Sequence, residues 1–337
     1  MDARLGSNYR LRNWINFSCA DGKRIVNEKA KPTAVFLMGP TASGKTSLSV
    51  RLAEALDAEI ISVDSALVYR GMDIGTAKPT EAERGGIVHH LIDILDPSEA
   101  FSTGQFRSRT LELIADISAR GKLPLLTGGT MLYFNALNHG LAQLPTADAA
   151  VRAELDKELE HIGKEAMHRR LAQVDPDSAA RIHPNDPQRV QRALEVYRLT
   201  GRTLTELFSE AETQPLPFRA VKLIIAPQDR KLLHEIIAKR FHQMLEQGLV
   251  EEVEKLYRRG DLSEKMPSIR AVGYRQVWSY LQGEYEHAEM TEKAIAATRQ
   301  LAKRQFTWLR RESDAHALIS GDPKALDLAL RYIVEPG

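Results

Sequence analysis

The feature that most constrains this chain is an eight-residue motif, Gly39-Pro40-Thr41-Ala42-Ser43-Gly44-Lys45-Thr46. It matches the pattern G-x4-G-K-[ST] in full and stands between a predicted strand, 33–38, and a predicted helix, 46–56. Its glycines allow a tight turn around an anion, toward which backbone N–H groups and the helix N-terminus point. Lys45 adds a mobile positive charge, and the Thr46 hydroxyl is a potential ligand for Mg2+. The motif predicts a polyphosphate site without saying which polyphosphate binds.

Apolar runs alternate with helical patterns after this motif. Further strands are predicted at 59–63, 88–95, 123–127 and 221–226. A helix is predicted over 106–120 and ends before Gly121. Because strands that alternate with helices indicate βαβ units, we predict an α/β fold with a P-loop NTPase-like parallel sheet as its core.

The patterns become charged and helical near Thr146. The helix predicted over 187–200 has Asp186 as N-cap, Pro187 at its first position and Gly201 after its end. Other helices are predicted over 151–174, 229–259, 274–281 and 290–311. The expected organisation has three parts. Residues 1–32 form an aperiodic N-terminal extension that could be disordered, residues 33–144 and 216–337 form an α/β core with C-terminal helices, and residues 145–215 form a helical insertion.

Composition excludes several classes of protein. The chain is 43% hydrophobic and 27% charged with a net charge of +1, which is ordinary for a globular protein and excludes a bulk polycation. The single cysteine, Cys19, excludes an intrachain disulfide and a Cys-based zinc site. It fits a reducing compartment, so we expect a cytoplasmic protein. The apolar runs are too short to span a bilayer. We expect no membrane association, and a monomer, since no surplus apolar stripe demands a partner.

Two further positions lie where a parallel sheet binds ligands. Asp64 follows the predicted strand 59–63, at the carboxyl edge of the sheet. It could be a general base, a metal ligand or an N-cap of the next turn. Gly128-Gly129-Thr130 follows another strand, and a double glycine there permits close approach of a ligand or forms a plain turn.

Positive charge is segregated within this neutral chain. The stretch 296–311 contains no acid and carries Arg299, Lys303, Arg304, Arg310 and Arg311. A second cluster lies mostly in the insertion and comprises Arg181, Arg189, Arg192, Arg198 and Arg202. A third segment, 268–276, is basic and contains an aromatic residue. These clusters suggest that a polyanion such as a nucleic acid lies against the protein. The alternative is a set of solvated helix faces.

Eight segments together resemble the tRNA dimethylallyltransferases, also called tRNA isopentenyltransferases. They are GPTASGKT (39–46), ISVDSALVYRGMDIGTAKP (61–79), LIDILDP (91–97), GGTMLYFNAL (128–137), RIHPNDPQRVQRALEVY (181–197), RFHQML (240–245), SIRAVGYRQVWSYL (268–281) and ATRQLAKRQFTWLR (297–310). The resemblance runs from about Thr33 to Arg311 and leaves 1–32 unplaced. The chain lacks the C-terminal Cys/His finger of eukaryotic members, which indicates the bacterial type.

The resemblance implies a reaction. A dimethylallyl group moves from dimethylallyl diphosphate to N6 of adenosine 37, beside the anticodon of tRNAs that read codons beginning with U. The phosphate loop then holds the diphosphate of the prenyl donor rather than ATP, with Mg2+ as cofactor. Asp64 matches the family's general base, and Lys45 and Thr46 stabilise the departing diphosphate.

The same resemblance makes 145–215 a helical insertion for tRNA binding and assigns contacts with the tRNA anticodon stem-loop. The matching residues are Asp64, Ser65, Ala66, Leu67, Thr130, Arg152, Gln188, Arg189, Val190, Gln191, Arg192, Ile269, Arg270, Ala271, Val272, Gly273, Tyr274, Ala302, Lys303, Arg304, Gln305, Phe306, Thr307, Trp308 and Leu309. Because the target base must reach a recessed carboxylate, we expect it to leave its stack.

Three other functions remain open at this point. A small-molecule kinase would use the same loop but leaves the basic clusters unexplained. An RNA-binding NTPase explains the clusters but gives Asp64 no particular role. An adenylate prenyltransferase would modify free nucleotides, and the basic insertion argues against it.

Overall fold

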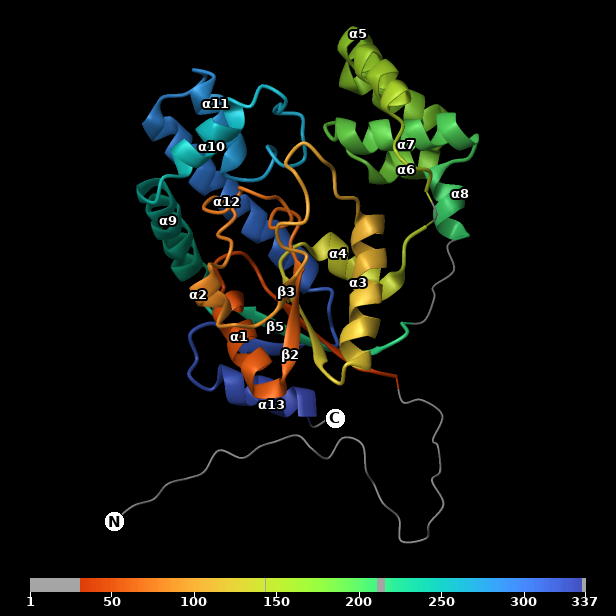
Figure 1. Cartoon of the computed structure of the whole chain (residues 1–337). Coiled ribbons are helices and arrows are strands. Elements are labelled where there is room, and N and C mark those ends of the chain that lie inside the picture. Colours follow the sequence, from red (N-terminus) through yellow and green to blue (C-terminus); the bar gives the residue numbers. More distant parts are fainter. Residues whose placement is uncertain (1–30, 143, 211–215, 335–337) are drawn as a thin grey trace, which may run out of the picture. The chain divides into compact units, whose positions relative to one another are not determined.

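The computed structural model describes residues 31–142, 144–210 and 216–334 of the chain. The extension predicted over 1–32 lies almost entirely outside these residues. The described residues of Met1–Phe134 and Leu216–Gly337 form one compact unit, unit 1, and those of Asn135–Pro215 form a second, unit 2 (Figure 1). The predicted helical insertion, 145–215, lies inside unit 2, which begins earlier in the chain.

Unit 1 is built on one parallel sheet with the strand order β3-β2-β4-β1-β5-β6. The strands are β1 (Thr33–Met38), β2 (Ala58–Val63), β3 (His89–His90), β4 (Leu123–Gly128), β5 (Arg219–Ala226) and β6 (His316–Ile319). Ala34 to Met38 of β1 are fully buried, because β1 lies between β4 and β5 and both faces of the sheet are covered. The predicted α/β fold with a parallel sheet is confirmed.

The helices of unit 1 are α1 (Lys45–Leu56), α2 (Glu81–Arg84), α3 (Thr103–Ala119), α9 (Arg230–Glu246), α10 (Leu249–Tyr257), α11 (Tyr274–Leu281), α12 (His287–Leu309) and α13 (Ala325–Val334), with α4 (Met131–His139) leading into unit 2. Of these, α1, α3 and α13 pack against strands of the sheet (Figure 1). Leu52 of α1 and Ala329 of α13 pack with Leu37 and Leu223 in one apolar cluster. A separate cluster around Tyr274 holds α10, α11 and α12 together.

Some elements differ from the sequence prediction. The single helix predicted over 229–259 is two helices, α9 and α10, because Gly248 has a left-handed φ of 97° that ends the first one. The strand predicted over 88–95 is reduced to β3, after which Leu91 and Asp93 take positive φ values of 62° and 56°. The sequence patterns do not predict β6 or α13.

Unit 2 consists of α-helices in its described part. They are α5 (Ala149–Val174), α6 (Pro176–Arg181), α7 (Pro187–Thr200) and α8 (Leu204–Ser209). Helix α7 follows the prediction: the Asp186 side chain accepts from the Arg189 N–H, Pro187 occupies the first turn, and Gly201 ends the helix at φ 68°. Gly163 interrupts α5 with a φ of 76°. Among all described helices of the chain, none has the length and apolar character needed to cross a membrane.

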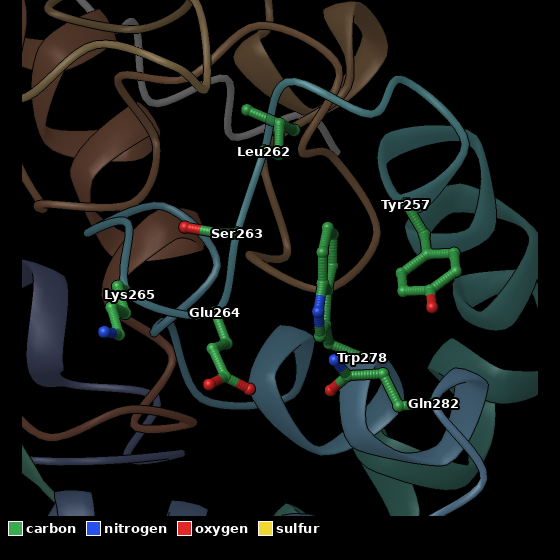
Figure 2. A pocket seen from close by; sticks show the side chains of 7 residues that line it. All are labelled: Tyr257, Leu262, Ser263, Glu264, Lys265, Trp278 and Gln282. Carbon is green, nitrogen blue, oxygen red and sulfur yellow. The ribbon is translucent and has the colours of Figure 1, made fainter.

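A cavity of about 480 Å3 lies among the C-terminal helices of unit 1. Figure 2 shows the Trp278 side chain near the centre of its lining, between Glu264 and Tyr257. The lining is completed by Leu262, Ser263, Lys265 and Gln282. None of these residues belongs to the phosphate loop or to the predicted tRNA contacts, so the cavity is separate from the site that the sequence predicts.

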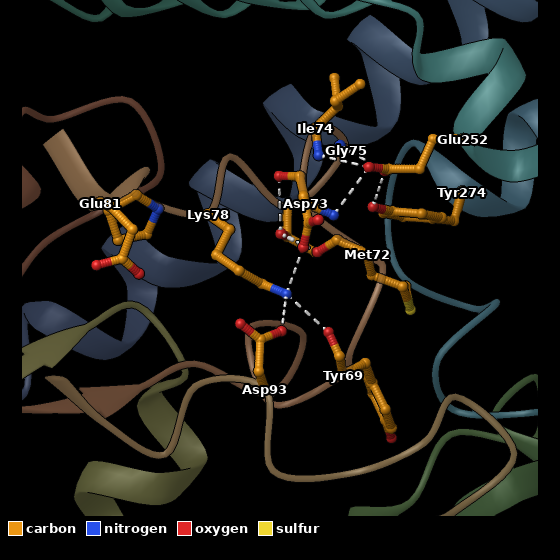
Figure 3. A network of polar contacts seen from close by, with 12 residues as sticks. Tyr69, Met72, Asp73, Ile74, Gly75, Lys78, Glu81, Asp93, Glu252 and Tyr274 are labelled. Atoms are coloured by element: carbon orange, nitrogen blue, oxygen red, sulfur yellow. Dashed lines mark hydrogen bonds and ion pairs between the residues drawn. The ribbon is translucent and has the colours of Figure 1, made fainter. Parts of the chain in front are cut away.

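The segment that follows Asp64 is held at its far end by two charged side chains (Figure 3). The Glu252 carboxylate accepts from the backbone N–H groups of Asp73, Ile74 and Gly75 at 3.0, 2.8 and 3.2 Å, and also from the Tyr274 hydroxyl.

The second of these side chains is the buried Lys78 ammonium. It donates to the Tyr69 carbonyl at 2.8 Å and to Asp73 at 2.6 Å, and it is also paired with Asp93. Because every proton of this buried cation has an acceptor, the segment between β2 and α2 has a fixed conformation.

We expect Glu252→Ala to destabilise the protein by about 2–3 kcal/mol, because three backbone N–H groups lose their acceptor. The measurement is the midpoint of urea unfolding. Glu251→Ala is the matched control, since Glu251 is an exposed carboxylate on the same turn of α10 and its midpoint should stay near wild type. Equal midpoints for the two variants would contradict the role given to Glu252.

Candidate active site

The first part of the site is the loop that joins β1 to α1. A Cβ atom on Gly39 would lie 2.3 Å from the Ile225 carbonyl oxygen, so only glycine fits there. Ala42 and Gly44 have left-handed φ values of 62° and 79°, which turn successive peptide N–H groups toward one side. The backbone N–H groups of residues 42–47 donate to no described residue. Unpaired donors at a helix N-terminus are suited to bind an anion, and the binding of a polyphosphate here stays a prediction of the motif.

The Lys45 ammonium is folded back onto its own loop. It donates to the Pro40 carbonyl at 2.5 Å and lies 3.5 Å from the Ser43 hydroxyl. Burial lowers the pKa of Lys45 to about 7, with the negative charge of Asp64 opposing this shift and the positive charge of Arg240 adding to it. Near neutral pH this lysine is therefore divided between its charged and neutral forms until an anion arrives.

Asp64 and the Gly128–Thr130 turn occupy neighbouring strand ends. Since β4 lies between β2 and β1, the glycine turn stands between Asp64 and the phosphate loop. The Asp64 carboxylate accepts from the Ala66 N–H at 2.8 Å, and the Thr130 hydroxyl accepts from the Ser65 N–H at 3.1 Å. Asp64 therefore caps the turn after β2 and also faces the loop lysine, so two of the roles considered for it are compatible.

The carboxylate of Asp64 is under electrostatic influence from two cations. Burial raises its pKa, while the Ala66 N–H and the charges of Lys45 and Arg240 oppose the rise. Arg240 lies on α9, and its guanidinium forms no hydrogen bond or ion pair within the described part of the chain. Burial lowers the pKa of Arg240, yet a guanidinium stays charged in proteins.

Sequence reasoning missed Arg240 as a site residue. The signal was present, because Arg240 begins the segment 240–245, one of the eight that resemble the tRNA dimethylallyltransferases. No spacing in the sequence relates α9 to the ends of β1 and β2, so only the fold brings this arginine to Asp64 and Lys45.

The residues of unit 1 that the resemblance assigns to tRNA differ in burial. Several are buried in the protein's own core, namely Ile269, Gly273, Tyr274, Ala302, Gln305 and Leu309. Ile269, Tyr274 and Ala302 belong to apolar clusters of the core. The exposed members are Ser65, Arg270, Lys303, Arg304 and Thr307, while Asp64, Ala66, Leu67, Thr130, Ala271, Val272, Phe306 and Trp308 are half-buried.

Helix α12 presents unpaired positive charge. The exposed side chains of Lys303 and Arg304 form no ion pair or hydrogen bond with any residue that the structure describes. The two aromatic residues that follow are covered by arginines of the chain itself. Arg230 lies 5.8 Å from the centre of the Phe306 ring, and Arg311 lies 5.1 Å from that of Trp308. Both rings are therefore engaged within the protein.

The arginines of unit 2 are engaged in a different way. Glu195 is fully buried and accepts from Arg152 at 2.9 Å and from Arg192 at 2.6 Å. Burial opposes its ionisation, but these hydrogen bonds hold the pKa of Glu195 below its usual value. Val190 is buried, and Gln191 donates to Asp156 at 2.8 Å.

Gln188, Arg189 and Arg152 are the exposed residues of this group, and Arg152 is paired with Glu195. The Arg189 side chain is 73% exposed and lies 3.4 Å from Asp186, and Gln188 is exposed as well. Arg189 is therefore the arginine on α7 that is most accessible to a ligand, whereas Arg192 is needed by Glu195.

Few side chains near the phosphate loop could ligate a metal ion. In the described part of the chain no group of three or more His, Cys, Asp or Glu residues could hold a metal ion. The Thr46 side chain is exposed at the start of α1 and its hydroxyl bonds no described residue. A hydroxyl beside a phosphate site suits Mg2+, which keeps several waters and takes further oxygen ligands from phosphates.

A parallel sheet with a phosphate loop after its central strand defines a P-loop NTPase-like α/β protein. Residues 67–312 match the family model described as IPP transferase. The chain belongs to the IPP transferase family, and it is therefore an enzyme of the prenyltransferase class.

Proteins of known name support this assignment. The chain is 61% identical over 302 residues to the tRNA dimethylallyltransferase of Methylococcus capsulatus, covering 90% of this chain and 97% of that protein. It is 59% identical to the tRNA dimethylallyltransferase of Nitrosococcus oceani, covering 88% of this chain and 94% of that one.

Solved structures agree with the fold. The full-length tRNA isopentenylpyrophosphate transferase of Bacillus halodurans is 38% identical, with a TM-score of 0.66 and coverage of 90% of this chain and 97% of that chain. A eukaryotic dimethylallyltransferase, described as acting on tRNA, is 28% identical, with a TM-score of 0.75 and coverage of 90% of this chain and 78% of that chain.

We expect pyrophosphate binding to weaken as pH rises above 7, because the pKa of Lys45 is about 7 and an anion binds its charged form. The affinity should fall by up to tenfold per pH unit. The measurement is isothermal titration of pyrophosphate in metal-free buffer between pH 6.5 and 9. Lys45→Ala is the control that reports the titration of pyrophosphate itself. A slope in this variant as steep as in wild type would show that Lys45 is not responsible.

Proposed function

We propose that this enzyme transfers a dimethylallyl group from dimethylallyl diphosphate to N6 of adenosine 37 in tRNAs that read codons beginning with U. The observation that carries the proposal is a phosphate loop with unpaired N–H donors and Lys45, separated by one strand end from the carboxylate of Asp64. The names of the relatives, all of which are tRNA dimethylallyl- or isopentenylpyrophosphate transferases, support it.

The donor diphosphate binds the loop in this proposal. Backbone N–H groups of residues 42–47 and the Lys45 ammonium take its oxygens, and the Arg240 guanidinium lies where it can add a second cation. As the bond between the allylic carbon and the diphosphate oxygen breaks, negative charge grows on the leaving group, and donors already oriented toward it lower the barrier.

Asp64 takes the proton in this proposal. The exocyclic N6 lone pair is delocalised into the adenine ring, so the amine is a poor nucleophile and loses a proton as its bond to the allylic carbon forms. A carboxylate whose pKa is raised by burial is a stronger base than a solvated one. The proton passes from N6 to Asp64, and diphosphate leaves.

Mg2+ is proposed as the cofactor. Thr46 would hold it together with the oxygens of the donor diphosphate, and the ion would neutralise charge on the leaving group. ATP is not a substrate in this proposal.

The RNA partner is proposed to be the tRNA anticodon stem-loop. A flipped adenine is needed, since N6 of a stacked base could not approach a half-buried carboxylate at the end of β2. The exposed cations Lys303 and Arg304 of α12 and Arg189 of α7 are proposed to bind phosphates.

One assay separates the candidate functions. The full chain is incubated with labelled dimethylallyl diphosphate and either unmodified tRNA or AMP, and separately with labelled ATP. Prenylated tRNA supports the proposal, prenylated AMP supports an adenylate prenyltransferase, and release of the γ-phosphate supports a kinase or an NTPase.

We expect Asp64→Asn to lower the single-turnover prenylation rate by about 100- to 10,000-fold, the range for losing a general base. Binding of tRNA should change little, as measured by filter binding. The matched control is Asp57→Asn, because Asp57 is an exposed aspartate at the C-terminus of α1 in a left-handed conformation that asparagine accepts. A near-normal rate in Asp64→Asn would remove Asp64 from this role.

We expect the double variant Lys303→Gln with Arg304→Gln to bind tRNA more weakly. The slope of log affinity against log salt should fall by about 0.7–0.9 per lost phosphate contact. The control, Lys324→Gln with Arg331→Gln, removes the same charge from exposed positions on or beside α13. If both pairs show the wild-type slope, α12 does not bind phosphates. Arg192 is unsuitable for this test, because its loss leaves the buried Glu195 charge short of a partner.

A further inference from the structure

One side-chain amide joins the two loops that frame the candidate active site. The Gln305 side chain of α12 is only 8% exposed. Its carbonyl oxygen accepts from the Thr41 N–H of the phosphate loop at 2.8 Å, and its NH2 group donates to the Gly129 carbonyl of the turn after β4 at 2.9 Å. Both ends of the amide are therefore used, and one orientation satisfies both partners.

The surroundings are shaped to admit this amide. A Cβ atom on Gly129 would lie 2.4 Å from the Gln305 nitrogen and 3.3 Å from the Gly39 carbonyl oxygen. Glycine at position 129 thus leaves room for Gln305, whereas at position 128 it avoids the Val63 carbonyl oxygen, which would lie 2.0 Å from a Cβ atom there. In the phosphate loop, Thr41 contributes its N–H to Gln305, while the N–H groups of residues 42–47 remain unpaired.

The same turn continues to the carboxylate. Gly129 is followed by Thr130, whose hydroxyl accepts from the Ser65 N–H at 3.1 Å and whose own N–H donates to the Val63 carbonyl at 3.2 Å. Ser65 is the residue after Asp64. The Gln305 amide therefore connects the phosphate loop at the end of β1, through the turn at the end of β4, to the segment that carries Asp64 at the end of β2.

We propose that Gln305 is a positioning residue, which fixes the distance between the bound diphosphate and Asp64 and contacts no RNA. This inference rests on the proposed function, since both groups act in that reaction. The phosphate loop holds the diphosphate that leaves, and the segment after β2 carries the carboxylate that removes the proton. A shift of either segment by about 1 Å would therefore lower the rate of the chemical step by up to a hundredfold.

The neighbouring residues on α12 make the role distinguishable. Lys303 and Arg304 point to solvent and Gln305 points inward, so a change confined to Gln305 should leave the charged surface of the helix unaltered. A residue that contacts tRNA would change RNA affinity, whereas a positioning residue changes the rate at saturating substrate.

The test uses the full chain and the variant Gln305→Met, which keeps the length of the side chain and removes both hydrogen bonds. We expect the single-turnover rate at saturating dimethylallyl diphosphate and tRNA to fall by about tenfold to a hundredfold. The dissociation constant for tRNA and its salt dependence should stay within about twofold of wild type. Gln247→Met, at an exposed glutamine after α9, is the matched control and should keep the wild-type rate.

A second variant keeps the inference testable if Gln305→Met folds poorly. Gln305→Glu retains an acceptor for the Thr41 N–H but has no donor for the Gly129 carbonyl, and its rate should also fall while tRNA affinity holds. Thermal unfolding of each variant separates a rate effect from loss of folded protein.

Three results would overturn the inference. The first is a variant whose saturating rate per folded molecule equals that of wild type, which leaves Gln305 a structural role only. The second is weakened tRNA binding with a reduced salt slope, which makes Gln305 an RNA contact. The third is a wild-type protein that shows no prenylation. The last result would refute the proposed function itself, whereas the first two, obtained beside an active wild type, refute the inference alone.

Discussion

Unpaired backbone N–H groups at the start of α1 are the constraint on which the rest of unit 1 depends. Peptide donors that face no acceptor are tolerated only where an anion or water takes them, so the chain must keep residues 42–47 open and still rigid. Rigidity comes from outside the loop: β1 is buried on both sides, Gly39 is pressed against Ile225, and the Ser320 hydroxyl donates to the Ser43 carbonyl at 2.8 Å. The loop is thus shaped by segments distant in sequence.

Burial shifts the pKa values of Lys45 and Asp64, the two ionisable groups beside the phosphate loop, in opposite directions. It lowers the pKa of Lys45 and raises that of Asp64, so each group approaches its neutral form while their mutual attraction opposes the change. A polyphosphate entering the loop adds negative charge, which favours the ammonium form of Lys45. Ligand binding and proton uptake at the loop are therefore coupled through ordinary electrostatics.

Sequence patterns predicted the elements whose conformation depends on residues close by in the chain. The strand 33–38, the caps of α7 at Asp186 and Gly201, and the phosphate loop itself depend on neighbouring residues, and the structure has them where expected. The sequence could not show that β4 separates β2 from β1, because strand order is a long-range property. For the same reason it could not bring Arg240 to Asp64 or turn Gln305 inward, and it placed Gln305 among RNA contacts by resemblance alone.

The edges of the sheet carry a consequence for the behaviour of the protein in concentrated solution. An edge strand presents unpaired N–H and C=O groups that can template the addition of another chain, and long, flat edges favour aggregation. Here one edge is β3, a strand of two residues, and the other is β6, a strand of four. Neither offers a foreign strand more than a short row of partners. The long central strands, which are the most apolar, are enclosed between them and cannot recruit a second molecule while the sheet is intact.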